Sequence, residues 1–204
     1  MNTPQDMWNQ RFSTPDYVFG EAPNAFLVSQ ASRLGQGVAL ALADGEGRNG
    51  VWLAEQGFSV DAFDFSAPAI EKAKALAAKK QVSLNLSCTD WQSFNWKSDH
   101  YDLVVGIFFQ FATPLERDEL FEKIKLSLKP GGVLLIQGYG KDQLQHRTGG
   151  PGKLEHLYDE ELLRQAFSGF EVQVCHTYEA TLQEGAGHSG TSALVGFVAQ
   201  KPGA

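Results

Sequence analysis

The sequence predicts one α/β domain in which a mostly parallel sheet, covered by helices on both faces, ends in an antiparallel hairpin. Three observations support this prediction. Strand-like apolar runs alternate with helical segments along most of the chain. Several of these runs are apolar almost throughout, as in strands that are buried on both faces. The last two strand-like segments follow each other without an intervening helix, which is typical of antiparallel neighbours.

The expected elements begin after residue 37 and follow in a regular order. Strands are expected at residues 38–43, 60–64, 82–87, 101–107, 133–137, 171–182 and 191–200. Helices are expected at residues 49–56, 66–80, 114–128 and 159–167. Gly57 can end the first helix in a left-handed conformation, and Ser66 can cap the second. Thr113 and Glu116 form a capping-box pattern at the start of the third.

Two irregular segments flank this pattern. Residues 1–30 are aromatic and interrupted by Pro15 and Pro23, so we expect an irregular N-terminal arm. Residues 138–158 are too long for an ordinary connection and form a predicted insertion on the substrate side. The arm's aromatic residues have no regular element to pack within, so we expect the arm to close over a bound ligand as a lid. Residues 1–204 are predicted to form one domain.

Composition narrows the possible partners. The net charge is −7, with 17 Lys and Arg against 24 Asp and Glu and no basic cluster, so nucleic acid is not expected as a partner. No apolar run reaches the roughly 18 residues that a membrane span needs. The N-terminus lacks the features of a secretion signal, and cytoplasmic residence is the default expectation. Cys88 and Cys175 are expected as small core residues, and no metal site is expected.

A glycine-rich loop follows the first strand and opens the first helix. It reads Gly45-Glu46-Gly47-Arg48-Asn49-Gly50, a G-x-G-x-x-G pattern that lets the backbone approach a ligand at a helix N-terminus. Alone, the pattern is also compatible with a simple tight turn. Asp64 ends the second strand about 20 residues on, where an acid can bind ribose hydroxyls. The sequence thus predicts a Rossmann-like nucleotide site.

The third strand is followed by Asp90 and Trp91. A carboxylate or carbonyl there can accept a hydrogen bond from an adenine amino group while the indole packs on the ring. NAD and S-adenosylmethionine both contain this adenosine. A dehydrogenase usually needs more residues than this chain has to form the half of the protein that binds its substrate. The length of the chain therefore favours S-adenosylmethionine. The candidate cofactor-binding residues are Arg11, Ala43, Asp44, Gly45, Gly47, Asn49, Asp64, Phe65, Asp90, Trp91 and Ile107.

Several segments resemble the tellurite-resistance (TehB-like) branch of class I methyltransferases. The residues that carry the resemblance are the runs 45–49, 51–58, 62–66 and 128–132, the N-terminal segments 8–12, 20 and 23–27, and the segments 148–151 and 184–190. The resemblance extends over nearly the whole chain, and its Glu-Gly-Arg-Asn run is the most specific part. It implies a seven-stranded sheet, S-adenosylmethionine as donor and S-adenosylhomocysteine as product, with a chalcogen oxyanion or thiol as acceptor.

One departure concerns the first strand. Class I enzymes commonly carry an acid in this strand and a glycine ahead of the loop, whereas this chain has Ala41 and Ala43. Asp44, Glu46 and main-chain carbonyls are the alternatives for contacting the ammonium group of the donor. Arg11 is a candidate for holding the donor's carboxylate, with a surface ion pair as its alternative role.

Methyl transfer is an in-line displacement that depends on alignment and on exclusion of water. The sequence shows no obvious catalytic dyad, which favours a soft or anionic acceptor. The acceptor is expected over the carboxyl edge of the sheet, covered by the arm and the 138–158 insertion. The catalytic candidates are Tyr17, Arg147, which can bind an oxyanion, and His156, which can accept a proton. A solvated loop position is the alternative for Arg147.

Two other functions remain open from the sequence. A nucleotide-dependent oxidoreductase is compatible with the glycine loop alone. A sensor that binds S-adenosylmethionine without turnover is compatible with the missing strand-one acid and the missing dyad. Binding of a nicotinamide cofactor separates the first alternative from a methyltransferase, and single-turnover methyl transfer separates the second.

Overall fold

The computed structural model describes residues 3–146 and 148–203 and confirms the predicted sheet. Its seven strands lie in the order β3-β2-β1-β4-β5-β7-β6. Their bounds are β1 (Val38–Leu42), β2 (Ser59–Asp64), β3 (Asn85–Cys88), β4 (Tyr101–Ile107), β5 (Leu128–Tyr139), β6 (Glu171–Glu184) and β7 (His188–Gln200). The first five strands are parallel to one another, whereas β7 is antiparallel to both β5 and β6. The strand order reverses between β1 and β4, where open α/β sheets bind ligands.

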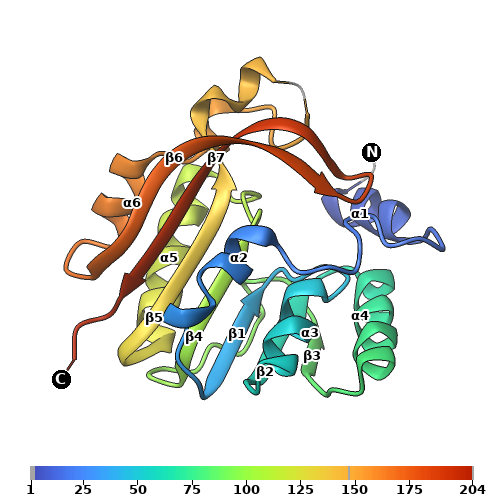
Figure 1. The fold of residues 1–204 in the computed structure, drawn as a ribbon, viewed down its shortest axis with the longest axis horizontal. Helices are drawn as coiled ribbons and strands as arrows, with labels where there is room; N and C mark the ends of the chain where they lie inside the picture. The colour runs from blue at the N-terminus through green and yellow to red at the C-terminus, as the bar shows by residue number, and fades with distance from the viewer. Residues whose placement is uncertain (1–2, 147, 204) are drawn as a thin grey trace.

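Six α-helices and three short 3₁₀ helices are present in the described residues. The α-helices are α1 (Pro4–Phe12), α2 (Ala25–Ser29), α3 (Arg48–Glu55), α4 (Ala67–Lys80), α5 (Pro114–Ser127) and α6 (Glu160–Ala166). The 3₁₀ helices are η1 (Ala31–Arg33), η2 (Lys141–Gln145) and η3 (Leu154–His156). Helix α2 crosses one face of the sheet, and α5 and α6 cover the other (Figure 1). No helix among residues 3–146 and 148–203 is long and apolar enough to span a membrane.

The alternation of side chains along β1 divides the core between the two faces. Leu40 and Leu42 belong to the cluster that contains Phe121 of α5. Ala39 and Ala41 belong to the cluster that contains α2 and α3 residues. Successive residues of a strand point to opposite faces, so a strand covered on both sides is apolar at every position. This is the physical reason for the continuous apolar runs in the sequence.

The N-terminal arm is more regular than predicted. Thr3 and Asp6 form a capping box at the start of α1, with proline at the first helical position, and the Asn24 side chain caps α2. The expectation of an irregular arm was therefore wrong for these two helices, because it gave Pro15 and Pro23 more weight than the local capping signals. The expected third strand is also displaced, since β3 begins at Asn85 rather than at residue 82.

The β6–β7 hairpin is longer than predicted and reaches the N-terminal arm. Its strands extend to Glu184 and from His188. The hairpin arches over the carboxyl ends of the parallel strands, and its tip lies beside α1 (Figure 1). The Gly187 amide donates a hydrogen bond of 2.9 Å to the Val18 carbonyl. The arm, the hairpin tip and the glycine loop therefore meet at one edge of the sheet.

Candidate active site

Two strained residues mark the point where the strand order reverses. Ala43 follows β1 with φ of 45°, and Phe108 follows β4 with φ of 52°. Non-glycine residues in this region cost about 1–3 kcal/mol and concentrate at functional sites. Because β1 and β4 are neighbours, both residues lie at the same carboxyl edge. This edge is where the sequence places the nucleotide loop.

The glycine loop requires its glycines for two physical reasons. Gly45 and Gly47 have φ values of 56° and 87°, which side chains disfavour. A Cβ atom on Gly47 would also lie 2.6 Å from the Cβ atom of Ala73, so α4 leaves no room for it. Gly47 then caps α3. These glycines therefore allow the loop to turn tightly at the N-terminus of α3 and to pack closely against α4.

Asp64 joins the end of β2 to this loop. Its carboxylate accepts hydrogen bonds from the Gly45 amide at 3.0 Å and the Ser66 amide at 2.9 Å. Burial raises the pKa of Asp64, and these amides partly offset the effect. Each carboxylate oxygen can accept more than one hydrogen bond, so Asp64 can fix the loop and also bind hydroxyl groups. The buried Ser66 hydroxyl, for which the described residues supply no partner, lies two residues further along the chain. This donor and acceptor set fits a ribose diol.

The two acids proposed for the donor's ammonium group both serve the loop itself. Asp44 accepts a hydrogen bond of 3.0 Å from the Gly50 amide, and burial raises its pKa to about 7. Glu46 forms an ion pair of 2.7 Å with Lys72 and accepts a hydrogen bond from the Phe19 amide. The Asn49 side chain likewise accepts from the Asn24 amide. The chemistry of these residues toward a donor stays a prediction.

A buried polar network joins the glycine loop to the hairpin. Arg48 and Glu184 form an ion pair of 2.7 Å, and His188 Nδ1 lies 3.3 Å from the same Glu184 oxygen. The Asn24 amide group donates to the other Glu184 oxygen at 2.9 Å and to Gln137 at 2.6 Å. Burial acts to raise the pKa of Glu184, but the hydrogen bond from His188 and the Arg48 cation outweigh it and hold the pKa at about 2.

Aromatic rings surround the histidine of this network. Phe19 of the arm and Phe108 after β4 each contact the His188 ring with a centroid separation of 4.3 Å. Tyr139 of β5 is 5.8 Å away. The Arg11 guanidinium lies over the Phe19 ring, at 5.1 Å from its centroid. The predicted cofactor residue Arg11 is thus placed beside His188.

The structure separates two of the three predicted catalytic residues. Tyr17 donates a hydrogen bond of 3.0 Å to the Lys72 carbonyl of α4. His156 Nδ1 lies 3.4 Å from the Gln110 carbonyl, on the far side of β4 toward α5. Arg147 lies outside the described residues. Tyr17 and His156 therefore contact different elements and do not form one constellation.

The remaining predicted cofactor residues lie at the ends of β2, β3 and β4. The Phe65 carbonyl accepts a hydrogen bond of 2.9 Å from Gln5 of α1. Asp90 accepts a hydrogen bond of 2.7 Å from the Ser93 amide and is exposed. The Trp91 indole is buried in the core, and Ile107 is buried at the end of β4. Contact of these four residues with adenine or donor stays a prediction.

The sequence did not identify Arg48, Glu184 and His188 as one group. Arg48 and Glu184 are 136 positions apart, and only the arching hairpin brings them together. Both lie inside segments that carry the family resemblance, which was the available signal.

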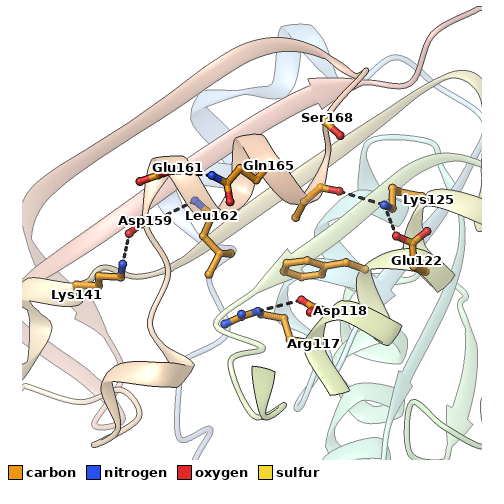
Figure 2. Close-up of a pocket in the computed structure, with 12 residues that line it drawn as sticks. Arg117, Asp118, Glu122, Lys125, Lys141, Asp159, Glu161, Leu162, Gln165 and Ser168 are labelled. Carbon is orange, nitrogen blue, oxygen red and sulfur yellow. Dashed lines mark hydrogen bonds and ion pairs between the residues drawn. The ribbon is translucent and has the colours of Figure 1, made fainter. Parts of the chain in front are cut away.

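A cavity of about 740 Å³ lies elsewhere, between α5 and α6 (Figure 2). Charged side chains line it, among them Arg117, Lys125 and an ion pair between Lys141 and Asp159. No residue of the glycine loop lines this cavity. Among residues 3–146 and 148–203, no group of three His, Cys, Asp or Glu side chains is placed to hold a metal ion.

Two comparisons of sequence match part of the chain. Residues 39–132 match the model of a methyltransferase domain family. A curated relative, carboxy-S-adenosyl-L-methionine synthase from Hydrogenovibrio crunogenus, is 33% identical over 85 residues, which are 41% of this chain and 34% of the relative. The chain therefore matches about a third of the length of that relative.

Solved structures show the same fold over almost the whole chain. One, from a study of the conversion of a disulfide bond into a thioacetal group during echinomycin biosynthesis, has a TM-score of 0.79 at 15% identity and covers 98% of this chain and 92% of its own. TehB from Haemophilus influenzae has a TM-score of 0.73 at 19% identity, and the match covers 97% of this chain and 66% of TehB. The N-methyltransferase NodS from Bradyrhizobium japonicum, in complex with S-adenosylhomocysteine, has a TM-score of 0.70 at 14% identity. The match covers 98% of this chain and 100% of NodS.

Proposed function

We propose that the chain transfers a methyl group from S-adenosylmethionine to a small acceptor; the match of residues 39–132 to a methyltransferase domain family and the fold shared with the N-methyltransferase NodS support this proposal. The observation that carries the proposal is the position of Asp64 and the Gly45–Gly47 loop. They lie together at the carboxyl edge of the sheet, next to the reversal of strand order, where Asp64 accepts a hydrogen bond from the Gly45 amide. S-adenosylmethionine supplies an electrophilic methyl group on a positively charged sulfur.

The residues present fit this donor. Asp64 would accept hydrogen bonds from the ribose hydroxyls, and the glycine loop would approach the donor through its backbone. Asp90 would accept from the adenine amino group. Arg11 lies over the Phe19 ring, which contacts His188, and we therefore place it on the acceptor side instead of at the donor's carboxylate. Gln5 of α1 already binds the Phe65 carbonyl, so the arm covers the end of β2 beside this site.

For the acceptor, we propose a chalcogen oxyanion or a thiol. The resemblance to the TehB-like branch supports this class, as does the fold shared with TehB at a TM-score of 0.73. The guanidinium of Arg11 beside His188 adds positive charge and hydrogen-bond donors on the acceptor side. Such groups suit a small anion.

A second candidate is a sensor that binds S-adenosylmethionine without turnover. The observation in its favour is that Asp44 and Glu46, which stand closest to the missing strand-one acid in sequence, are both engaged within the protein. Single-turnover transfer of a labelled methyl group distinguishes the two candidates.

Calorimetric titration of the purified protein with S-adenosylmethionine, S-adenosylhomocysteine and NAD tests the donor. We expect micromolar binding of the two sulfur compounds and at least tenfold weaker binding in Asp64→Asn. Asp61→Asn is the matched control, because Asp61 lies on the same strand but binds Lys97 and Tyr101 instead. Binding of NAD alone, or of none of the three compounds, would refute the proposal.

A further inference from the structure

We propose that His188, oriented by Glu184, takes the proton of the acceptor during methyl transfer, and that the Tyr139 hydroxyl and the Arg11 guanidinium bind the acceptor beside it. This inference rests on the proposed function and assigns its acceptor side. It replaces the predicted roles of Tyr17 and His156 in catalysis with a constellation that the folded chain brings together.

The contact between Glu184 and His188 determines which nitrogen of the imidazole carries the proton. A carboxylate accepts hydrogen bonds only, so the His188 Nδ1 atom that lies 3.3 Å from Glu184 carries the proton. The Nε2 atom is then the nitrogen that can accept a proton. Glu184 is itself held by Arg48 at 2.7 Å and by Asn24 at 2.9 Å. The pair therefore has the arrangement of a base and its orienting carboxylate.

Burial keeps this imidazole neutral and ready to accept. His188 is 8% exposed, and the rings of Phe19 and Phe108 pack against it. Burial lowers the pKa of His188, although the hydrogen bond to Glu184 opposes the effect. The charged groups that face His188 are Glu184, Arg48 and Arg11. Protonation of His188 is therefore supported by a carboxylate and opposed by two cations.

Tyr139 supplies an independent observation that points to a ligand. The residue is 2% exposed, and its hydroxyl has no hydrogen-bond partner among the described residues. A buried polar group without a partner costs about 1–3 kcal/mol. Gly149 lies directly against the hydroxyl, because a Cβ atom there would be 2.9 Å from it. An acceptor oxygen or sulfur beside His188 would supply the missing hydrogen bond.

Arg11 supplies the charge. Within the described residues its guanidinium forms no hydrogen bond or ion pair and instead lies over Trp8 and Phe19 at 4.8 and 5.1 Å. It also lies near the hairpin turn, 3.1 Å from the position of a Cβ atom on Gly187. Gly187 precedes His188, so the cation is adjacent to the proposed base. An anionic acceptor there would form a charge-assisted contact.

A lone pair of the acceptor forms the new bond to the methyl carbon, and the carbon–sulfur bond of the donor breaks with its electron pair on sulfur. The acceptor's proton moves to His188 Nε2 and then to solvent. A neutral thioether, S-adenosylhomocysteine, and the methylated acceptor leave the site.

The test measures methyl transfer to selenite and to dithiothreitol as a function of pH, with donor affinity measured in parallel. We expect His188→Gln to lower kcat/KM at least 100-fold and to remove the acidic limb of its pH profile. Glu184→Gln should move that limb to lower pH, because Glu184 raises the pKa of His188. Donor affinity should stay within threefold of wild type in His188→Gln. His176→Gln, on the exposed part of the same hairpin, is the matched control.

Tyr139→Phe is a second variant that should not impair folding, since it removes only an unpartnered hydroxyl. We expect it to raise the KM for the acceptor about tenfold with a smaller effect on kcat, and Arg11→Gln to do the same more strongly for selenite. Unchanged pH profiles in His188→Gln and Glu184→Gln, with turnover of an acceptor by the wild-type protein, would overturn the inference. Failure to bind the donor, or binding of the donor without turnover of either acceptor, would instead overturn the proposed function.

Discussion

The guanidinium of Arg48 and the carboxylate of Glu184 lie 2.7 Å apart and are both nearly buried. Arg48 begins helix α3 directly after the glycine loop, and Glu184 ends strand β6 at the tip of the hairpin. This ion pair fastens the hairpin over the loop that we assign to the donor. The contact therefore links the stability of the fold to the geometry of the proposed site.

We expect Glu184→Ala to lower the free energy of unfolding by about 3–5 kcal/mol, because it leaves Arg48 as an uncompensated buried charge. Urea denaturation followed by circular dichroism measures this change. Glu71→Ala is the control, since Glu71 also lies 2.7 Å from a lysine, but in an exposed pair. The control should change stability by no more than about 1 kcal/mol. Equal effects of the two substitutions would contradict the prediction.

The same carboxylate makes the protein sensitive to acid. The pKa of Glu184 is about 2 in the folded protein, below its ordinary value of 4.5. The stability that this shift supplies is fully present above pH 4.5 and is lost as the pH falls toward 2. We expect wild type to lose more stability than Glu184→Gln between pH 5 and about pH 2.5. Parallel slopes in urea titrations at several pH values would argue against this role.

The contribution of Asp44 to stability has the opposite dependence on pH. Burial raises its pKa to about 7, so between pH 4 and 7 the folded state holds a proton that the unfolded state has released. The contribution of Asp44 to stability therefore falls as the pH rises, by about 1.4 kcal/mol per pH unit at most. We expect Asp44→Asn to be more stable than wild type at pH 8 and no more stable at pH 4. A stability difference that is independent of pH would show that Asp44 titrates normally.

The two ends of α3 offer a matched pair of substitutions. Gly47 and Gly57 have φ values of 87° and 93°, but only Gly47 faces another element, Ala73 of α4. We expect Gly57→Ala to cost about 1–2 kcal/mol through backbone conformation alone. Gly47→Ala should cost about 1–3 kcal/mol more, through overpacking against α4, and should also weaken donor binding. Thermal unfolding and calorimetry measure the two effects, and similar results for both variants would contradict the assignment.

The N-terminal arm is expected to act as a lid over the donor. Phe12 of α1 is 4% exposed and packs near Gly45, whereas Met7 of the same helix is 52% exposed. We expect Phe12→Ala to weaken donor binding at least tenfold and to cost about 3–5 kcal/mol of stability. Met7→Ala should change stability by less than about 0.5 kcal/mol. Donor should also slow proteolytic cleavage within residues 4–26, and equally fast cleavage with and without donor would refute the lid.

Local patterns in the sequence predicted most of the fold. The continuous apolar run of β1 and the capping box of Thr113 and Glu116 are short-range signals, and both elements formed where expected. The glycine loop, followed by Asp64, predicted a nucleotide site at the carboxyl edge of the sheet. This signal is also local, because the strand, the loop and the helix are adjacent in the chain. The capping box of α1 was equally local, but the prolines that follow it obscured it.

The acceptor side depended on tertiary structure. His188, Tyr139 and Arg11 come from the hairpin tip, the end of β5 and the first helix, and no spacing in the sequence relates them. Tyr17 and His156 were equally suitable as catalytic residues by residue type. In the structure, however, Tyr17 donates a hydrogen bond to α4, and His156 contacts the Gln110 carbonyl. The sequence alone determined the parallel sheet and its nucleotide loop, because periodicity and capping act within one element. Only the tertiary structure decided which side chains face that loop, because the curvature of a long hairpin sets which distant residues meet.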